Sequence, residues 1–415
     1  MNYGYGAFVK VPLEGLDNSS QHFEVQMYDR TQTTIDKFDA SIHLEEVEAE
    51  GVGVLLYEDY HEFNLKRISA GLASKENRFL NDVDFVVRHQ VVSLKAADIV
   101  IPNGAIQIGN SLIKDTLYMS RLFSIRAYKN DKSTGWKWQQ DSSLKFSHSD
   151  QLKGFTVAFC YHRLYGQFFH WFLDCLPRLW LLQRSKVNVD LYIIPGFDEH
   201  DFISESVKVL GVDKKSIVKI DSPQTLRVDS LVFPTSYVKE SQKVRPSLGD
   251  GVNYKGGWDY KYIRDVNSKF RSAVESSRVL HKRIFVDRSD SNHRQVKNHA
   301  ELLSLLDRYG FHVVTPGLLT FVEQVSVFRD AEVVLGVHGA GLTNILWCKP
   351  DEASVIELVV DKLGDPGYRF IAGMLGLNYE YILTAPDQDH RHGIAFADVY
   401  VDLETLEEKL KDLGL

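Results

Sequence analysis

Residues 334–348 read VLGVHGAGLTNILWC, an apolar run that passes through two closely spaced glycines into a second apolar run. Residues 333–337 have the length and composition of a buried strand. Residues 342–347 predict the first part of a helix. A buried strand that turns directly into a helix is typical of a doubly wound α/β domain, so this stretch decides the expected fold.

The chain on either side of this turn repeats the alternation. RIFVDR and FHVVTP read as strands before it, ASVIELV reads as a strand after it, and HAELLSLLDRYG and FVEQVSVFRDA read as helices. Asn298 with Glu301, and Thr320 with Glu323, predict capping boxes at these two helices. A similar alternation starts near residue 155. We therefore expect two doubly wound domains that face each other across a cleft.

The part of the chain before residue 130 has a different pattern. Short β-rich runs such as GVGVLLYEDY and FVVRHQVVSL are separated by turn-forming residues, without a long helical stripe. The sequence therefore predicts three units: a β-rich region over 1–130, a first Rossmann-like domain over 131–258, and a second over 259–415 with a closing C-terminal helix.

The turn HGAG is the first candidate binding site. Gly339 and Gly341 lack a Cβ, which would let the backbone approach a ligand closely. The first amides of the following helix have no partner within the helix and carry partial positive charge, so they favour phosphate. Thr343 and Asn344 would add side-chain donors, and His338 would point into the same space. The alternative is a turn that serves packing alone.

A polar loop follows the strand RIFVDR and holds Arg288, Asp290, His293 and Arg294. If the strand lies in a parallel sheet, this loop lies at its carboxyl end, beside the expected cleft. The guanidinium fork suits bidentate contact with a diphosphate, which makes Arg288 and Arg294 the candidates. The alternative is a solvated polar loop.

The segment YGQFFHWFLDCLPRLWLL predicts a buried helix with one polar stripe. His170, Asp174 and Arg178 recur at intervals of four residues, and Pro177 should kink the helix close to Asp174. Buried ionisable groups are costly unless they are paired or face a cleft. Our hypothesis is a general base, His170, held in orientation by Asp174. The alternative is a structural network of the three side chains.

Composition excludes several classes of protein. A formal charge of −8 argues against a nucleic-acid partner, and three cysteines without metal-type spacing argue against a disulfide framework. HExxH, GxSxG and P-loop motifs are absent from the sequence. Asp82 with Asp84, and Asp387 with Asp389, have a carboxylate spacing that metal sites share with many ordinary loops, so we expect no metal site.

We see no signal peptide and no apolar run long enough to span a membrane, so we expect a cytoplasmic protein. Residues 259–282 predict a helix with Ile263, Val266, Phe270 and Val274 on one face and basic residues on the rest. The basic face is either solvated or lies near an anionic substrate or membrane surface, which would allow peripheral attachment to the inner face of a membrane.

Three segments, taken in this order, resemble glycosyltransferase family 61, a family of the capsular polysaccharide biosynthesis type. They are GQFFHWFLDCLPRLWLL, VDRSDSNHRQVKN, and LTFVEQVSVFRDAEVVLGVHGAGLTNILWCKP with the strand SVIELV, and they lie within residues 160–360. The resemblance implies a GT-B architecture, with the donor bound mainly by the second domain. It also implies inverting transfer from a nucleotide sugar, without an essential metal or other cofactor.

The resemblance assigns expected roles to individual residues. His170 and Asp174 would be catalytic. The donor would be bound by Arg288, Arg294, the turn and first helical residues His338, Gly339, Ala340, Gly341, Leu342, Thr343 and Asn344, and Glu357 as the carboxylate on the ribose hydroxyls. One departure is His299, where the family usually has Glu; because this position opens a helix, we expect the change to affect capping more than chemistry.

These expectations combine into an inverting, metal-independent glycosyltransferase of bacterial surface polysaccharide synthesis, with a glycan or lipid-linked acceptor. His170 would take the proton of the acceptor hydroxyl, and the helix amides with the two arginines would stabilise the leaving diphosphate. One alternative is a pyruvyl or phosphoryl transferase of polysaccharide assembly. Another is a protein that binds nucleotide or glycan without turnover. No oligomeric state follows from the sequence.

Overall fold

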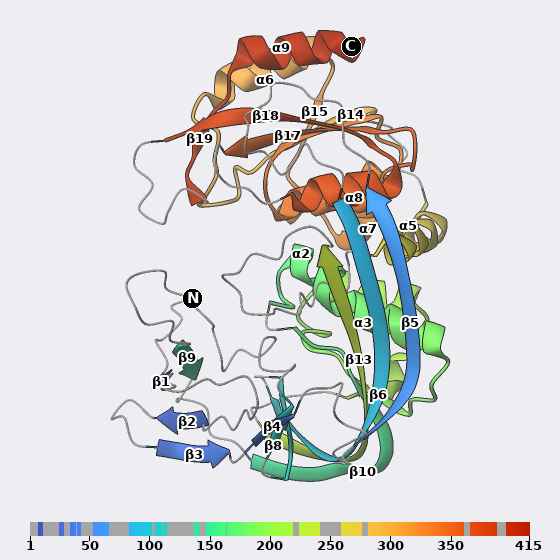
Figure 1. Cartoon of the computed structure of the whole chain (residues 1–415). Coiled ribbons are helices and arrows are strands. Elements are labelled where there is room, and N and C mark those ends of the chain that lie inside the picture. The colour runs from blue at the N-terminus through green and yellow to red at the C-terminus, as the bar shows by residue number, and fades with distance from the viewer. Residues whose placement is uncertain are drawn as a thin grey trace.

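The structure is a computed structural model of the 415-residue chain. It describes residues 7–10, 25–28, 34–38, 40–42, 53–65, 83–101, 104–109, 111–113, 137–140, 147–162, 164–218, 224–240, 259–275, 281–360, 366–387 and 396–415. Two large sheets form the two halves of the described molecule (Figure 1).

The first half is built on a mixed sheet with the strand order β12-β11-β10-β13-β6-β7-β8-β4, and β5 also pairs with β6. Its strands are β4 (Ala40–Ile42), β5 (Gly53–Leu65), β6 (Val83–Ile101), β7 (Ala105–Ile108), β8 (Ser111–Ile113), β10 (Ser147–Phe159), β11 (Leu191–Ile193), β12 (Ile217–Val218) and β13 (Gln224–Glu240). The pairs β1 (Ala7–Lys10) with β9 (Lys137–Gln140), and β2 (Val25–Tyr28) with β3 (Thr34–Phe38), form separate two-stranded sheets.

This sheet differs from the expected first Rossmann-like domain. Strands β10 to β13 are parallel, as expected, but β13 pairs antiparallel with β6 along almost its whole length. Strands on both sides of residue 130 therefore share one sheet. The sequence did not reveal this, because the partners of a strand far away in the chain leave no local periodicity.

The second half is the doubly wound domain that the sequence predicts. Its strands are β14 (Arg283–Val286), β15 (His312–Val314), β16 (Val333–Val337), β17 (Ser354–Val360), β18 (Asn378–Pro386) and β19 (Val399–Tyr400), in the order β15-β14-β16-β17-β18-β19. The first five are parallel. The chain leaves β14 toward β15 and then returns to the other side, so the switch point lies between β14 and β16.

Helices cover both faces of the second sheet (Figure 1). On the outer face lie α6 (His299–Arg308) and α9 (Leu403–Asp412), and on the face toward the first half lie α5 (Tyr260–Ala273), α7 (Phe321–Phe328) and α8 (Gly367–Leu375). The expected capping box of Thr320 and Glu323 is confirmed at α7. At α6, Asn298 makes no side-chain cap and bonds the backbone of Val401 instead.

The helical segment of the first half contains α2 (Phe168–His170), a π-helical turn (Trp171–Cys175), α3 (Leu176–Ser185) and, farther on, α4 (Asp201–Val209). The expected distortion near Asp174 is thus a π turn directly before α3, which begins with Leu176 and Pro177. Single π turns within α-helices occur frequently at functional sites.

The two halves share a hydrophobic core. Phe172 of the π turn lies 5.3 Å from Phe321 of α7, 5.1 Å from Trp347 and 6.2 Å from Phe270 of α5, measured between ring centroids. The expected cleft is therefore filled at this level. The strands β5 and β6 also reach α8, where Phe85 packs on the ring of Phe370 (Figure 1).

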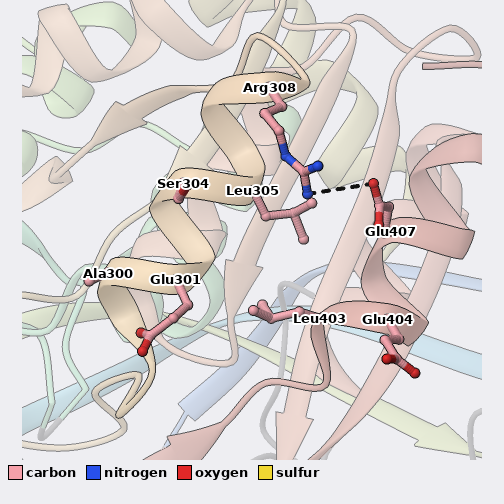
Figure 2. A pocket seen from close by; sticks show the side chains of 8 residues that line it. All are labelled: Ala300, Glu301, Ser304, Leu305, Arg308, Leu403, Glu404 and Glu407. Atoms are coloured by element: carbon pink, nitrogen blue, oxygen red, sulfur yellow. Dashed lines mark ion pairs between the residues drawn. The ribbon is translucent and has the colours of Figure 1, made fainter.

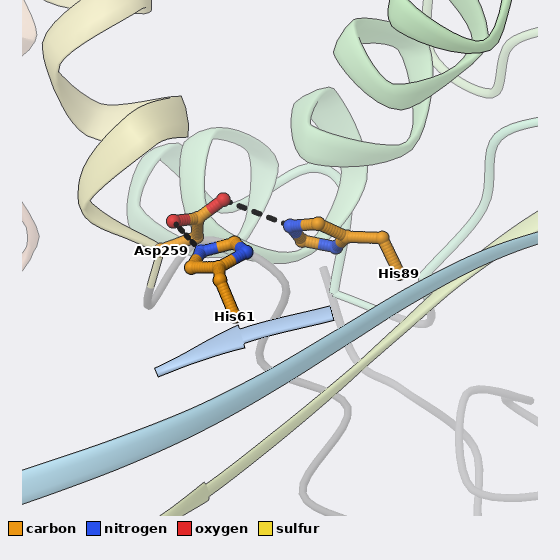
Figure 3. Close-up of side chains that lie close together, drawn as sticks. All are labelled: His61, His89 and Asp259. Carbon is orange, nitrogen blue, oxygen red and sulfur yellow. Dashed lines mark hydrogen bonds and ion pairs between the residues drawn. The ribbon is translucent and has the colours of Figure 1, made fainter. Parts of the chain in front are cut away.

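The start of α5 is held by a buried carboxylate (Figure 3). Asp259 accepts hydrogen bonds from the backbone amide of Lys261 and from Nε2 of both His61 on β5 and His89 on β6, each histidine at 2.8 Å. Burial raises the pKa of Asp259, but the two histidines outweigh this, so that its pKa lies well below the ordinary value. This cluster ties the second half to the long strands of the first.

Candidate functional site

The turn HGAG lies at the switch point of the second sheet. It follows β16 and leads into a 3-10 helix, η5 (Ala340–Trp347), where we expected an α-helix. A Cβ on Gly339 would lie 1.9 Å from Nη1 of Arg288, and one on Gly341 would lie 3.0 Å from Cγ1 of Val286. Neighbouring side chains thus fill the space beside the two glycines. One of them, Arg288, is a candidate phosphate ligand.

Arg288 and Arg294 lie together beside this turn, as predicted. The guanidinium of Arg288 lies against Gly339, and Nη1 of Arg294 donates a hydrogen bond of 3.0 Å to the backbone oxygen of His338. Burial and then the charge of Arg294 lower the pKa of Arg288 from its ordinary value. Two like charges this close are unfavourable alone and become favourable when an anion binds between them.

Two details indicate that the loop after β14 is constrained to hold Arg288 and Arg294 beside the turn. The backbone of Arg294 lies in the left-handed region, with φ of 58°, which is uncommon for a residue other than glycine and costs about 1 kcal/mol or more. Nε of Arg288 is buried and has no hydrogen-bond partner among the described residues. A buried, unsatisfied donor of this kind is stabilised when a ligand oxygen reaches it.

His338 forms a buried pair with Glu357 of the neighbouring strand β17. Nδ1 of His338 lies 2.5 Å from Oε1 of Glu357, and the hydroxyl of Tyr379 on β18 donates to Oε2 at 2.5 Å. Burial and Glu357 raise the pKa of Tyr379 well above its ordinary value, so Tyr379 keeps its proton. Glu357 is completely buried and both oxygens are engaged, which places it behind His338 rather than at a surface open to a ribose.

The other residues of the turn serve packing. Asn344 is completely buried: its amide nitrogen donates to Gln324 and to the backbone of Gly341, and its oxygen accepts from Trp347. Leu342 and Thr343 are also completely buried, whereas Ala340 is exposed. The sequence suggested Thr343 and Asn344 as side-chain donors to a ligand. Both are buried, so neither faces an open site in this structure.

His170 and Asp174 form the pair that their spacing predicts. Nδ1 of His170 lies 2.6 Å from Oδ2 of Asp174, and 27% of the His170 side chain is exposed against 8% for Asp174. Arg178, the third member of the predicted stripe, is elsewhere: its guanidinium bonds the backbone oxygen of Pro234 and stacks on Phe233. The intervening π turn and the kink explain why the stripe does not continue.

His162 is a site residue that the sequence did not indicate. Its ring stacks on that of His170 with centroids 5.3 Å apart, and its Nδ1 lies 3.9 Å from Oδ2 of Asp174. Nδ1 accepts the backbone amide of Leu164, which fixes the neutral tautomer with the proton on Nε2. The residue follows β10 in a loop, and no local pattern links it to the helix that starts at Phe168.

Two aromatic rings connect the pairs of the two halves. Phe169 packs on His170 with centroids 5.3 Å apart and on Tyr368 of α8 at 5.8 Å, and Tyr368 packs on His338 at 5.0 Å. A chain of ring contacts thus links the histidine of one half to the histidine of the other. The carboxylates of both pairs hold Nδ1, so that Nε2 of each ring is the nitrogen left to contact a ligand.

Two surface cavities lined by described residues of the second half bear on the position of the site. One of about 190 Å³ adjoins the arginine loop and is lined by Asp287, Arg288, Ser289 and His299 among others. Nε2 of His299 bonds Asp287 at 2.9 Å. Burial raises the pKa of Asp287, but Ser289, the backbone of Arg288 and His299 lower it more. We had expected His299 to matter mainly at the start of the helix. The structure shows that it also bonds the loop that carries Arg288.

A larger groove of about 500 Å³ runs between α6 and α9, on the outer face of the sheet (Figure 2). It is lined by Glu301, Glu404 and Glu407, with Arg308 paired to Glu407 at 3.6 Å. An excess of carboxylates repels a diphosphate. Size therefore does not identify the candidate site here, which rests on the guanidinium groups of Arg288 and Arg294 beside the turn HGAG.

Two groups among the described residues have the composition of a metal site: His61, His89 and Asp259 (Figure 3), and His162, His170 and Asp174. In each, a carboxylate oxygen lies within hydrogen-bond distance of an imidazole nitrogen. Hydrogen bonds thus account for both clusters. The absence of an essential metal stays a prediction.

The carboxylate pairs suggested by the sequence do not form such a group among the described residues. Asp387 pairs with Lys297 at 3.3 Å, and Asp84 lies on β6. Asp82 and Asp389 lie outside the described residues.

The basic face of α5 is used within the protein. Arg264 donates to the backbone oxygen of Met374 and to the carboxylate of Asp351. Arg271 donates to the backbone oxygens of Arg329 and Trp347. The predicted apolar face of this helix is confirmed as buried. Among the described helices, none has the length and apolar character needed to cross a membrane.

Comparison with known proteins adds independent support. Residues 168–356 match the model of the family described as Glycosyltransferase 61. This segment contains the His170 pair, the arginine loop and the turn HGAG, and it agrees with the range of the expected resemblance. It supports the expected resemblance to glycosyltransferases for this part of the chain.

Two relatives are similar over shorter segments. One is an EGF domain-specific O-linked N-acetylglucosamine transferase of Drosophila melanogaster, 36% identical over 93 residues, which cover 21% of this chain and 17% of that protein. Another is a beta-1,2-xylosyltransferase of Arabidopsis thaliana, 31% identical over 112 residues, which cover 26% of this chain and 19% of that protein. The matched segment is less than a fifth of each relative, and neither comparison concerns a capsular polysaccharide.

Proposed function

We propose that the protein is a glycosyltransferase that moves a sugar from a nucleotide-sugar donor to an acceptor hydroxyl. The observation that carries the proposal is the meeting of Arg288, Arg294 and the turn HGAG at the switch point of a doubly wound sheet, with the His170–Asp174 pair across two aromatic rings. The first group suits a diphosphate, and the second suits a general base.

The donor diphosphate would lie between Arg288 and Arg294, next to Gly339. Negative charge grows on the leaving phosphate during transfer, and fixed guanidinium groups stabilise this charge without rearrangement. They would act where other enzymes use a metal ion. We therefore keep the expectation that no metal or other cofactor is essential.

His170 would remove the proton from the acceptor hydroxyl through Nε2, because Asp174 holds Nδ1. The hydroxyl oxygen forms the new bond to the anomeric carbon as the bond to the diphosphate breaks, and a single displacement inverts the configuration. A positioned base typically contributes about 10²–10⁴-fold to the rate. The hydrogen bond of 2.6 Å to Asp174 supports this assignment of roles.

The acceptor and the cellular setting complete the proposal. A glycan or lipid-linked glycan of bacterial surface polysaccharide, used in the cytoplasm at the inner face of the membrane, is the acceptor that the family resemblance implied. Because α5 uses Arg264 and Arg271 within the protein, its basic face offers little support for membrane attachment. Transfer assays with lipid-linked glycans and with a folded EGF domain as acceptors distinguish this setting from that of the insect relative.

The first test is thermal stability in the presence of UDP, GDP, dTDP or CMP, with and without EDTA. A ligand at 100 times its dissociation constant stabilises the fold by about 2.7 kcal/mol, which a melting curve resolves. We expect a shift with one nucleotide that EDTA does not change and that Arg288→Ala reduces. Arg308→Ala, in the groove between α6 and α9, is the matched control and should respond as wild type.

A shift that EDTA abolishes would overturn the metal-free mechanism. A protein that binds none of the nucleotides would contradict the donor site itself. Binding without transfer to any acceptor would instead favour a nucleotide-binding protein without turnover.

A further inference from the structure

We infer that His338, held by Glu357, takes up a proton when a nucleoside diphosphate binds and becomes the third cation of the leaving-group site. The inference rests on the proposed function and deepens it. Glu357 is then a positioning residue that acts through His338, and not a ligand of the ribose.

The tertiary structure fixes the orientation of the His338 ring. The backbone amide of His338 bonds the oxygen of Leu358, which sets the register of β16 against β17 and places Glu357 next to the imidazole. Oε1 of Glu357 lies 2.5 Å from Nδ1, while Tyr379 occupies Oε2. A carboxylate with both oxygens engaged leaves the imidazole no freedom to flip, and Nδ1 must carry a proton to make this bond.

The opposite nitrogen is the one open to a ligand. Nε2 of His338 has no hydrogen-bond partner among the described residues and is not completely buried, although only 9% of the side chain is exposed. The backbone oxygen of the same residue accepts from Arg294, and the next residue lies under Arg288. A diphosphate held by these arginines thus comes close to Nε2.

This arrangement requires a proton. With Nδ1 protonated, a neutral His338 presents a lone pair at Nε2, which a phosphate oxygen repels. An imidazolium presents an N–H group instead and makes a charge-assisted hydrogen bond. The proton comes from solvent and forms one N–H bond at Nε2, and no other bond changes.

The charges around the ring explain why the proton arrives together with the ligand. The groups that face His338 or its partners are Arg288 and Arg294 from the loop after β14, Glu357 from β17, Tyr379 from β18, and Tyr368 and Arg369 from α8. In the free protein the guanidinium groups oppose another positive charge. A bound diphosphate reverses this balance, and the buried carboxylate of Glu357 supplies the counter-charge on the far side of the ring.

The test is calorimetric titration of UDP, GDP and dTDP at pH 8 in two buffers of different ionisation enthalpy, which counts the protons taken up on binding. At this pH a terminal phosphate, with a second pKa of roughly 6, is already ionised. We expect wild type to take up about one proton with the diphosphate and none with the corresponding nucleoside. Glu357→Gln should take up less and bind the diphosphate on the order of tenfold more weakly, with nucleoside affinity unchanged.

Two further variants make the result decisive. Asp259→Asn neutralises an equally buried, histidine-bonded carboxylate outside the site and should match wild type. His338→Gln keeps a polar side chain that cannot change its charge, so it should abolish proton uptake even if Glu357→Gln fails to fold. Diphosphate binding to wild type without proton uptake, or unchanged uptake in His338→Gln, would overturn the inference while the proposed donor site stands. If none of the nucleotides binds wild type, the proposed function fails and this inference fails with it.

Discussion

The two halves each contribute a histidine whose Nδ1 is held by a carboxylate, but they build the pair in different ways. His170 and Asp174 are four residues apart on one helical segment. His338 and Glu357 are 19 residues apart and meet because β16 and β17 are neighbours in a parallel sheet. The first pair is 27% and 8% exposed and the second 9% and 0%. The more local pair is also the more accessible one, which agrees with the role proposed for His170 as a base that must meet an acceptor.

The largest effect is expected when the local pair is broken. His170→Ala removes the proposed base, and turnover should fall by about 10²–10⁴-fold, while the melting temperature stays close to that of wild type because the side chain is partly exposed. Steady-state transfer assays and melting curves measure both. His312→Ala, an exposed histidine on β15, is the control. Near wild-type turnover in His170→Ala would assign the base to another residue.

A smaller effect on chemistry but a large one on stability is expected at the contact between the halves. Phe172→Ala empties the centre of the aromatic cluster that joins the π turn to α5, α7 and η5, and truncation of a buried Phe typically costs about 3–5 kcal/mol. Denaturant unfolding measures this loss. Phe172→Leu should retain most of the stability. Equal stability of Phe172→Ala and wild type would show that the two halves are joined elsewhere.

The smallest effect is expected where structure is purely local. Thr320→Ala removes the side-chain cap of α7, which should lower the free energy of unfolding by about 1 kcal/mol and leave nucleotide binding unchanged. Thr320→Ser, which keeps the hydroxyl, is the control. A change in nucleotide affinity would mean that the start of α7 is coupled to the turn HGAG and that its role is not purely local.

Features that depend on near neighbours in the chain could be predicted. The strand and turn at 333–341, the cap at Thr320 and the buried face of α5 follow from local periodicity and capping chemistry. The pair of His170 and Asp174 follows from helical spacing. Asn298 shows the limit: its predicted cap is replaced by bonds to the backbone of Val401, which directly follows β19 and is 103 residues away in the chain.

Features that depend on strand register and on docking of the halves could not be predicted. The sequence suggested Asn344 and Glu357 as ligands, yet packing buries both. It also did not indicate His162, which reaches the site from a separate loop. Polar residues at a turn look the same in a sequence whether they face a ligand or a neighbouring helix, since only the tertiary structure decides which side is covered.

The sequence by itself therefore determined the doubly wound second half, the arginine loop beside the turn HGAG and the first histidine–carboxylate pair. Each of these is encoded by residues within a few positions of one another or by the rule that parallel strands end at one edge of a sheet. Only the tertiary structure decided that strands before and after residue 130 share one sheet and that the halves share a core. It also decided that Glu357 faces His338, because contacts between distant segments depend on register and burial, which no local pattern records.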